Sequence, residues 1–163
     1  GSVIPLFEEQ IRQKKPITIT NSEMTRFMMS VSDTIELVFK TTLLAKGGEV
    51  FILKMPVIRL GDLVDVIIET FAEKYHYKKE TIEKRIIGLR PGEKMFEELM
   101  TESEAAVGFE TDDMLIIPPQ LEMPSISYSV SDYPDARRCT INHYSSRDLK
   151  PISKPEIKKL LFP

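Results

Sequence analysis

The chain has 163 residues, 42% hydrophobic and 29% charged, which is the length of about one domain and a composition that can bury a core. Its 22 basic and 25 acidic residues leave a net charge of -3, so nothing favours nucleic-acid binding. A single cysteine excludes an internal disulfide, and with only two histidines beside it we expect no metal site. No apolar run reaches the roughly 18 residues of a membrane span. We therefore expect a soluble, cytoplasmic chain without membrane insertion.

The sequence lacks the motifs that are typical of cofactor binding or of a catalytic nucleophile. It contains no G-x-G-x-x-G, no G-x-x-x-x-G-K-[ST], no G-x-S-x-G and no H-E-x-x-H. The chain therefore either binds without catalysis or belongs to a larger protein. The chain begins without a Met, and segment 1–7 starts in the middle of a sequence pattern, which favours a fragment. Gly1-Ser2 resembles a cloning remnant.

Periodicity predicts helices alternating with short strands in the first half. Ile4, Phe7 and Ile11 recur at helical spacing, so we expect a helix over 3–14. Apolar and polar residues then alternate over 17–20, as in a half-buried strand. The next expected elements are an extended piece at 24–29, a helix capped by Ser32 and ended by Gly47-Gly48, a strand at 49–54 covered on both sides, a helix at 60–75 and a strand at 85–89.

The second half predicts shorter elements. We expect a helix over 94–100 and another over 102–107 that starts with a capping box at Thr101. Beyond Phe109 the prolines leave room only for a strand at 114–117 and a final helix at 154–162. We therefore divide the chain into an α/β domain at residues 1–113 and a proline-rich extension at 114–163, which packs on that domain or on a neighbouring subunit. The fold class is mixed α/β, with too few strands for a complete doubly wound sheet.

Two arginines are the strongest candidates for ligand binding. Arg90 lies in the turn Arg-Pro-Gly-Glu-Lys after a predicted strand, where its guanidinium suits bidentate phosphate recognition and Glu93 suits sugar hydroxyls. From composition alone, an ordinary surface turn is the simpler interpretation. Arg26 lies among apolar residues, so it needs either a ligand anion or an internal carboxylate. Two such arginines on separate extended segments could clamp one diphosphate.

Two other pairs of reactive residues are better explained by structure. Tyr75 and Lys79 have the Tyr-x-x-x-Lys spacing of short-chain dehydrogenases, but they lie where a helix runs into a charged connector with no glycine loop upstream. We interpret this spacing as coincidence. Cys139 and His143 are four residues apart, with no orienting partner or oxyanion site identified, so packing is the better interpretation.

Four stretches, taken in order, resemble a known family. They are Gly-Ser-Val-Ile-Pro-Leu-Phe, Pro-Ile-Thr-Ile-Thr-Asn-x-x-Met-Thr-Arg-Phe-Met-Met, Gly-Gly-Glu-Val-Phe-Ile-Leu-Lys-Met-Pro and Gly-Leu-Arg-Pro-Gly-Glu-Lys-Met-x-Glu-Glu-Leu-Met-Thr. Together they resemble the C-terminal half of capsule-type polysaccharide-biosynthesis proteins, the UDP-N-acetylglucosamine 4,6-dehydratases and 5-epimerases of the extended short-chain dehydrogenase/reductase family. The resemblance is specific through about Thr101 and looser beyond it.

The resemblance implies a substrate-binding half without its N-terminal Rossmann partner. Arg26 and Arg90 match positions that hold the nucleotide diphosphate, and Glu93 matches a ribose-hydroxyl acceptor. The remaining implied substrate contacts lie around the uracil pocket, at Ile17, Ile19, Val3 and Pro5. The resemblance implies NADP and catalytic residues in the absent half, so this piece alone should be inactive and should bind no cofactor. The alternative is a stand-alone, non-catalytic nucleotide-sugar-binding or protein-interaction module. A further expectation is homo-oligomerisation through the C-terminal extension. The sequence does not specify which hexosamine is made.

Overall fold

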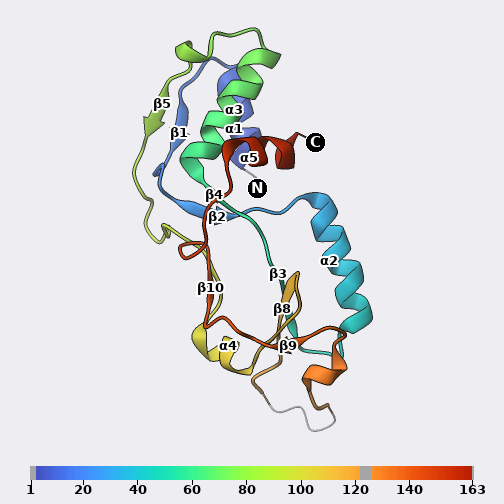
Figure 1. The fold of residues 1–163 in the computed structure, drawn as a ribbon. Coiled ribbons are helices and arrows are strands. Elements are labelled where there is room, and N and C mark those ends of the chain that lie inside the picture. Colours follow the sequence, from blue (N-terminus) through green and yellow to red (C-terminus); the bar gives the residue numbers. More distant parts are fainter. Residues whose placement is uncertain (1–2, 122–125, 163) are drawn as a thin grey trace. The chain divides into compact units, whose positions relative to one another are not determined.

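The computed structural model describes residues 3–121 and 126–162, and it shows a mixed α/β fold made of two compact units (Figure 1). Within the described chain, unit 1 comprises residues 3–28, 57–97 and 149–162, and unit 2 comprises residues 29–56 and 98–148 apart from the gap. This division differs from the expected boundary at residue 113. The difference arises because the tail contributes buried elements to both units.

Unit 1 packs three helices around short strands. Its strands form two pairs: β1 with β5 in parallel and β2 with β4 antiparallel. In Figure 1 the helices α1, α3 and α5 lie together at one end of this unit. The elements are α1 (Val3–Arg12), β1 (Ile17–Ile19), β2 (Thr25–Phe27), β4 (Val57–Arg59), α3 (Leu60–Lys74), a 3-10 turn (Lys79–Thr81), β5 (Lys84–Ile86) and α5 (Lys154–Leu161).

The core of unit 1 follows the apolar periodicity of its helices. Phe7 and Ile11 of α1 are buried, as their spacing predicts. Helix α3 supplies eight buried residues, and α5 closes the core with Ile157, which is fully buried. Ser153 and Glu156 form a capping box that starts α5. The predicted helices at both ends of the chain and at 60–75 are therefore confirmed.

Unit 2 is built on a four-stranded antiparallel sheet in the order β3-β8-β7-β9. A separate antiparallel pair joins β6 to β10. The elements are α2 (Val31–Leu44), β3 (Val50–Leu53), β6 (Glu98–Met100), α4 (Glu102–Val107), β7 (Phe109–Glu110), β8 (Met114–Ile117), a 3-10 turn (Val130–Asp132), β9 (Arg137–Arg138) and β10 (Tyr144–Ser145). The capping box at Thr101 and the helix after it are as predicted.

The tail contributes more core than we predicted. All four residues of β8 are buried, and β8 lies between β3 and β7 in the sheet. The aromatic ring of Tyr133 packs against Phe51 and Phe109 in the same unit. Residues after 113 therefore do not form a separate extension, because the apolar strand at 114–117 completes a sheet that β3 alone could not stabilise.

Three local predictions need correction. The cap of α2 is Ser30, which forms a capping box with Asp33, so the helix starts earlier than a cap at Ser32 would allow. Residues 94–100 are not helical, because Glu98–Met100 pairs with β10 and Met100 is fully buried. Strand β3 is covered less than expected, since Ile52 is buried but Val50 is exposed. In the second case tertiary pairing, rather than local pattern, decides the outcome.

Candidate functional site

Strand β2 carries Arg26 at the edge of unit 1. The strand pairs antiparallel with β4, and Arg26 lies opposite Ile58, whose side chain is buried in the core. The side chain of Arg26 is 24% exposed, so it is neither in the core nor free in solvent. Its position is therefore fixed by the contacts that it makes at the surface of this unit.

Backbone carbonyl groups hold the Arg26 guanidinium. Nη1 donates to Thr25 O at 2.7 Å and Nη2 donates to Lys94 O at 2.8 Å. Nε lies 3.6 Å from Oε1 of Glu97, whose carboxylate is half-exposed. Of the five N–H groups of an arginine, two donate to these carbonyls and one faces Glu97, so within the described residues one N–H group on each terminal nitrogen has no partner. The group is positioned by the protein and can still donate two hydrogen bonds to an anion.

The segment that carries Arg90 is a tight turn next to β2. Glu93 N donates to Arg90 O at 3.0 Å, Pro91 occupies the second turn position and Gly92 the third, with φ 81°. This is the pattern of a type II turn, whose third residue needs positive φ and therefore favours glycine. Thr25 N donates to Met95 O at 2.9 Å just after the turn. The backbone thus brings the turn beside the strand that bears Arg26.

Glu93 closes this turn with its side chain. Oε2 accepts a hydrogen bond from Arg90 N at 3.1 Å, and Oε1 accepts one from Thr20 Oγ1 at 3.4 Å. The Arg90 side chain is exposed, and its guanidinium makes no hydrogen bond or ion pair within residues 3–121 and 126–162. Arg90 is therefore available to a ligand, whereas the carboxylate of Glu93 is engaged in holding the loop.

The remaining predicted contacts are divided between core and surface. Ile17 and Ile19 are almost fully buried and belong to the core cluster of unit 1, so their side chains support the strand instead of facing an open pocket. Val3 packs partly against the same cluster, and Pro5 is exposed on α1. Pro5 is the most exposed of these four residues.

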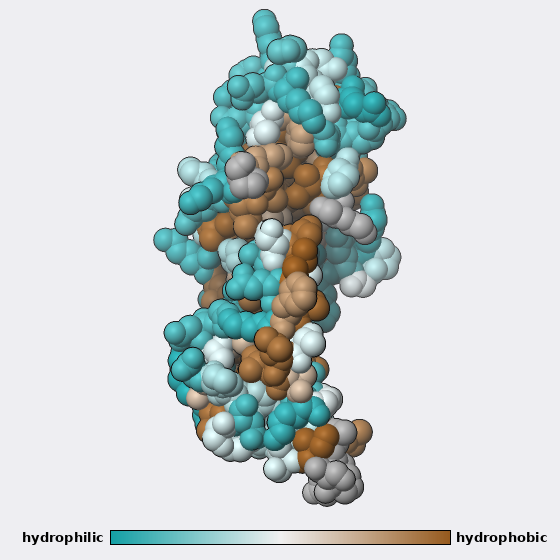
Figure 2. Space-filling view, turned by 90° about the vertical axis from the view of Figure 1, so that its right-hand side faces the viewer, coloured by the Kyte–Doolittle hydropathy of each residue, from teal (hydrophilic) through white to brown (hydrophobic). Residues whose placement is uncertain are grey.

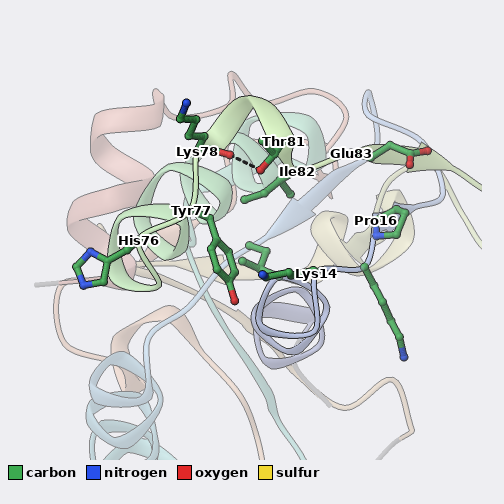
Figure 3. Close-up of a pocket in the computed structure, with 10 residues that line it drawn as sticks. Lys14, Pro16, His76, Tyr77, Lys78, Thr81, Ile82 and Glu83 are labelled. Carbon is green, nitrogen blue, oxygen red and sulfur yellow. Dashed lines mark hydrogen bonds between the residues drawn. The ribbon is translucent and has the colours of Figure 1, made fainter.

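A cavity of about 400 Å³ lies elsewhere in unit 1, at the C-terminal ends of α1 and α3 (Figure 3). Its lining contains none of the predicted site residues, although it includes Lys14, Lys78 and His76. Lys14 Nζ lies 5.1 Å from the centre of the Tyr77 ring, whereas Lys78 and His76 point away from that contact in Figure 3. Because these basic groups do not converge, the cavity is a weak candidate for an anion site.

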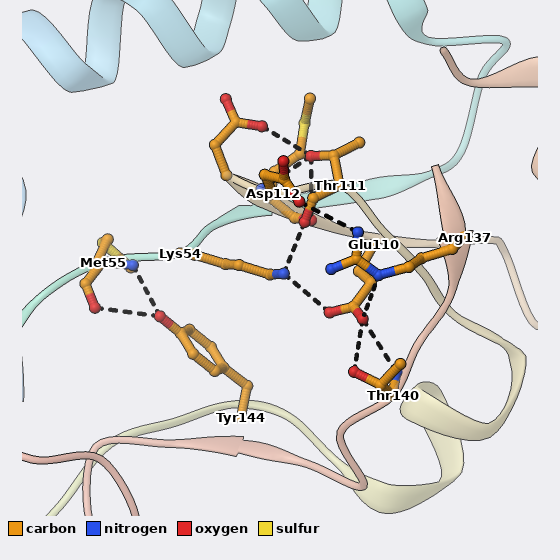
Figure 4. A network of polar contacts seen from close by, with 10 residues as sticks. Lys54, Met55, Glu110, Thr111, Asp112, Arg137, Thr140 and Tyr144 are labelled. Carbon is orange, nitrogen blue, oxygen red and sulfur yellow. Dashed lines mark hydrogen bonds and ion pairs between the residues drawn. The ribbon is translucent and has the colours of Figure 1, made fainter. Parts of the chain in front are cut away.

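A buried carboxylate organises unit 2 (Figure 4). Glu110 is 2% exposed and accepts hydrogen bonds from Lys54 Nζ at 2.9 Å, Thr140 Oγ1 at 2.7 Å and Arg137 Nε at 3.2 Å. Burial alone would raise the pKa of Glu110, but the hydrogen bonds from Lys54 and Thr140 outweigh it and lower the pKa to about 2. The network joins β7 and β9 to Lys54, the residue that follows β3, and each of its side chains has a partner, so it stabilises the unit and offers no reactive group.

The two other pairs singled out in the sequence do not form catalytic arrangements. Helix α3 ends at Lys74, so Tyr75 and Lys79 do not lie one helical turn apart. The Tyr75 hydroxyl donates to Glu8 Oε1 at 2.8 Å, and this contact raises the pKa of the phenol. Burial raises the pKa of the Cys139 thiol, while His143 pairs with Asp148 at 2.9 Å. Neither pair provides an activated nucleophile.

Sequence reasoning missed the residues that hold the candidate site together. Glu97 contacts Arg26 and Thr20 contacts Glu93; both lie within the stretches that carry the family resemblance, but nothing in the sequence marked them as partners of these residues. Glu110 was missed for the same reason, because a carboxylate in a short strand looks like any surface acid. These contacts join segments that are far apart in the sequence, so only the structure reveals them.

Comparison with known proteins gives the family. The sequence profile of the family described as polysaccharide biosynthesis protein matches residues 1–119. The chain belongs to this family. Its members are extended short-chain dehydrogenase/reductases that act on nucleotide sugars in polysaccharide biosynthesis. The resemblance inferred from the four sequence stretches is confirmed at this level.

Individual relatives cover almost all of this chain. "Uncharacterized membrane protein MJ1061" of Methanocaldococcus jannaschii is 46% identical, and "UDP-glucose 4-epimerase" of Rickettsia rickettsii is 32% identical, each over 99% of this chain and 45% of its own length. The X-ray structure of Pen from Bacillus thuringiensis is 45% identical, with a TM-score of 0.85 over 99% of this chain and 45% of that one. The chain thus spans about half the length of these relatives.

The expected cytoplasmic location needs correction. A relative that matches 99% of the chain is named as a membrane protein, which contradicts that expectation. Within residues 3–121 and 126–162, no helix combines the length and the apolar character that a bilayer span requires.

Proposed function

We propose that this chain is the UDP-sugar-binding part of a nucleotide-sugar 4,6-dehydratase/epimerase of polysaccharide biosynthesis, with a ligand of the UDP-N-acetylglucosamine type. The observation that carries the proposal is the pairing of a positioned Arg26 with an exposed Arg90 on an adjacent turn of unit 1. Guanidinium groups with spare N–H donors suit the oxygens of a diphosphate. Family membership supports a nucleotide sugar as the ligand.

The roles within the site follow from the contacts. Arg26 would donate its two remaining N–H groups to one phosphate, while Arg90 would move on its exposed stem to the other. Glu93 would keep the turn closed, and the exposed Pro5 would offer an apolar contact. Since both oxygens of Glu93 already accept hydrogen bonds, a ribose hydroxyl would have to share one of them.

The described residues do not fit NADP. The parallel pair of β1 and β5 is not followed by a glycine-rich turn that opens a helix, which is the element that receives a dinucleotide pyrophosphate. We therefore assign NADP binding, hydride transfer and proton transfer to the part of the family chain that lies outside this sequence. The 163 residues alone should bind ligand without turning it over.

The proposal is tested by titrating the isotope-labelled chain with UDP and UDP-N-acetylglucosamine in NMR experiments, which detect binding even when Kd is millimolar. We expect amide shifts at residues 26, 90 and 92–94. Arg90→Ala should weaken binding about tenfold or more, the usual effect of losing a hydrogen bond to a charged group. Arg85→Ala is the matched control, because Arg85 is an exposed arginine of the same unit. Equal affinities of wild type and Arg90→Ala would refute the assignment.

A further inference from the structure

Helix α2 presents an unpartnered apolar face. Five of its seven large apolar residues, Val31, Ile35, Val38, Phe39 and Leu43, are each between 51% and 87% exposed, and no residue of α2 is buried within the described chain. Figure 2, which views the side that bears α2 in Figure 1, shows a column of apolar side chains at the height of this helix. We call these five residues the α2 stripe.

The α2 stripe is not the face by which the helix packs on its own unit. Leu37 and Leu44, one heptad apart, pack against the cluster of Phe109, Met114, Ile116 and Tyr133. Lys40 adds an ion pair to Asp113. With about 100° per residue, positions 31, 35, 38 and 39 fall on another side of the helix. A helix that is apolar on two sides is typical of one that is covered on both.

Strand β3, which follows α2, is also incompletely covered. It is an end strand of the sheet, and Val50 is exposed although the sequence of the strand is almost continuously apolar. Apolar side chains gathered over successive elements mark a surface that binds another protein segment. The incomplete cover of β3 therefore agrees with the exposed α2 stripe.

We propose that the α2 stripe is the surface on which the rest of the family's chain packs, that is, the portion that lies outside these 163 residues. This sequence spans 45% of the length of Pen, and Pen has the same fold over the match with a TM-score of 0.85. In Pen this fold is therefore joined to a further polypeptide longer than itself, which must pack on some of its surface. The inference rests on the exposed α2 stripe and on the match to Pen, and it stands apart from the nucleotide-sugar proposal.

Thiol labelling tests this assignment. In a Cys139→Ser background, Phe39→Cys probes the stripe and Glu102→Cys, on the exposed side of α4, is the matched control. Maleimide labelling rates are compared between the chain alone and the chain fused, at the boundary of the match, to the part of Pen outside it. We expect both cysteines to react alike in the chain alone, and Phe39→Cys to react at least tenfold more slowly in the fusion. Glu102→Cys should keep its rate.

Each other result overturns the proposal. Undiminished labelling of Phe39→Cys in the fusion would show that the added polypeptide packs elsewhere. Slow labelling in the chain alone would show that a second copy, if concentration-dependent, or another part of this chain already covers the stripe. If the fusion does not fold, intact Pen with cysteines at the two aligned positions gives the same comparison, and equal rates there would again refute the proposal.

Discussion

Glu97 links Arg26 to the strand that carries it. One carboxylate oxygen lies 3.6 Å from Arg26 Nε, and the other accepts a hydrogen bond from Phe27 N at 2.9 Å. The carboxylate therefore fastens the end of β2 and orients the guanidinium at the same time. Since Glu97 is half-exposed and solvent screens its ion pair, Glu97 contributes to stability through the hydrogen bond more than through the ion pair.

Substitutions at Glu97 should separate these two effects. Glu97→Ala removes the acceptor of the Phe27 hydrogen bond and should lower the free energy of unfolding by about 1 kcal/mol. Glu97→Gln keeps an acceptor and should cost less, while the loss of negative charge beside Arg26 should strengthen UDP binding. Urea denaturation and NMR titration measure the two quantities. Weaker UDP binding by Glu97→Gln would contradict the electrostatic part of this prediction.

The stability of unit 2 should depend on pH through Glu110. Its pKa is about 2 in the folded protein and 4.5 as the ordinary value, so the stabilisation is fully present above about pH 4.5 and is lost as the pH falls toward 2. The shift corresponds to about 3 kcal/mol in total, of which about 2 kcal/mol should be lost by pH 3. Urea unfolding at pH 6 and pH 3, followed by circular dichroism, measures this loss.

Glu110→Gln is the control for that pH dependence. The variant should be less stable at pH 6, because Lys54 and Arg137 lose a charged partner. Its stability should also fall less between pH 6 and pH 3 than that of the wild type. Other carboxyl groups with a lowered pKa, such as Asp65 and Asp113, remain in both proteins and cancel in the comparison. Parallel curves for the two proteins would contradict the role of Glu110.

The turn beside Arg26 should depend on the glycine at its third position. A Cβ at Gly92 meets nothing within 4 Å, so only the positive φ of 81° opposes a substitution. Gly92→Ala should therefore cost about 1 kcal/mol, and Gly92→Asn should cost less, because asparagine tolerates this conformation better. Thermal unfolding gives the stabilities, and UDP titration reports whether Arg90 has moved. Equal effects of Ala and Asn would argue against backbone strain as the cause.

Removal of residues 114–163 should unfold unit 2. The deletion takes away β8, all of whose residues are buried between β3 and β7. The same deletion removes α5 and the buried Ile157 from the core of unit 1, so we expect loss of amide dispersion in NMR spectra in both units, rather than a folded chain that has merely lost an arm. A dispersed spectrum of the shortened chain would show that the sheet forms without its central strand.

The proposed assembly through the C-terminal region needs a milder change. Leu121 is 83% exposed, so Leu121→Glu should leave the fold intact. If this region mediates self-association, the variant should have a smaller mass than the wild type in light scattering at the same concentration. An unchanged mass would count against a contact at this position.

Much of the fold was readable from sequence because local signals agreed with tertiary structure. The apolar stripe of α3 and the capping box of α4 each specify an element without outside help. Residues 94–100 contain good helix formers, but pairing with Tyr144 and burial of Met100 make their end a strand. Periodicity could not reveal this, since the partner lies more than 40 residues away.

The candidate site was predictable only in part. Arg26 and Arg90 were identified from their motifs, and the structure brings their segments together through the Lys94 carbonyl. The partners of Arg26 include two backbone oxygens, which every residue possesses and no sequence pattern marks. Ile17 and Ile19 were assigned by resemblance, and the structure places both side chains in the core of unit 1.

The two units interleave along the chain, which passes between them after residues 28, 56, 97 and 148. Neither unit is a continuous stretch of sequence. A single recombination crossover between two relatives, wherever it falls from residue 29 to residue 148, therefore gives at least one unit parts from both parents. Exchange of either unit intact would instead require several coordinated breakpoints, so we expect this region to be inherited as one block.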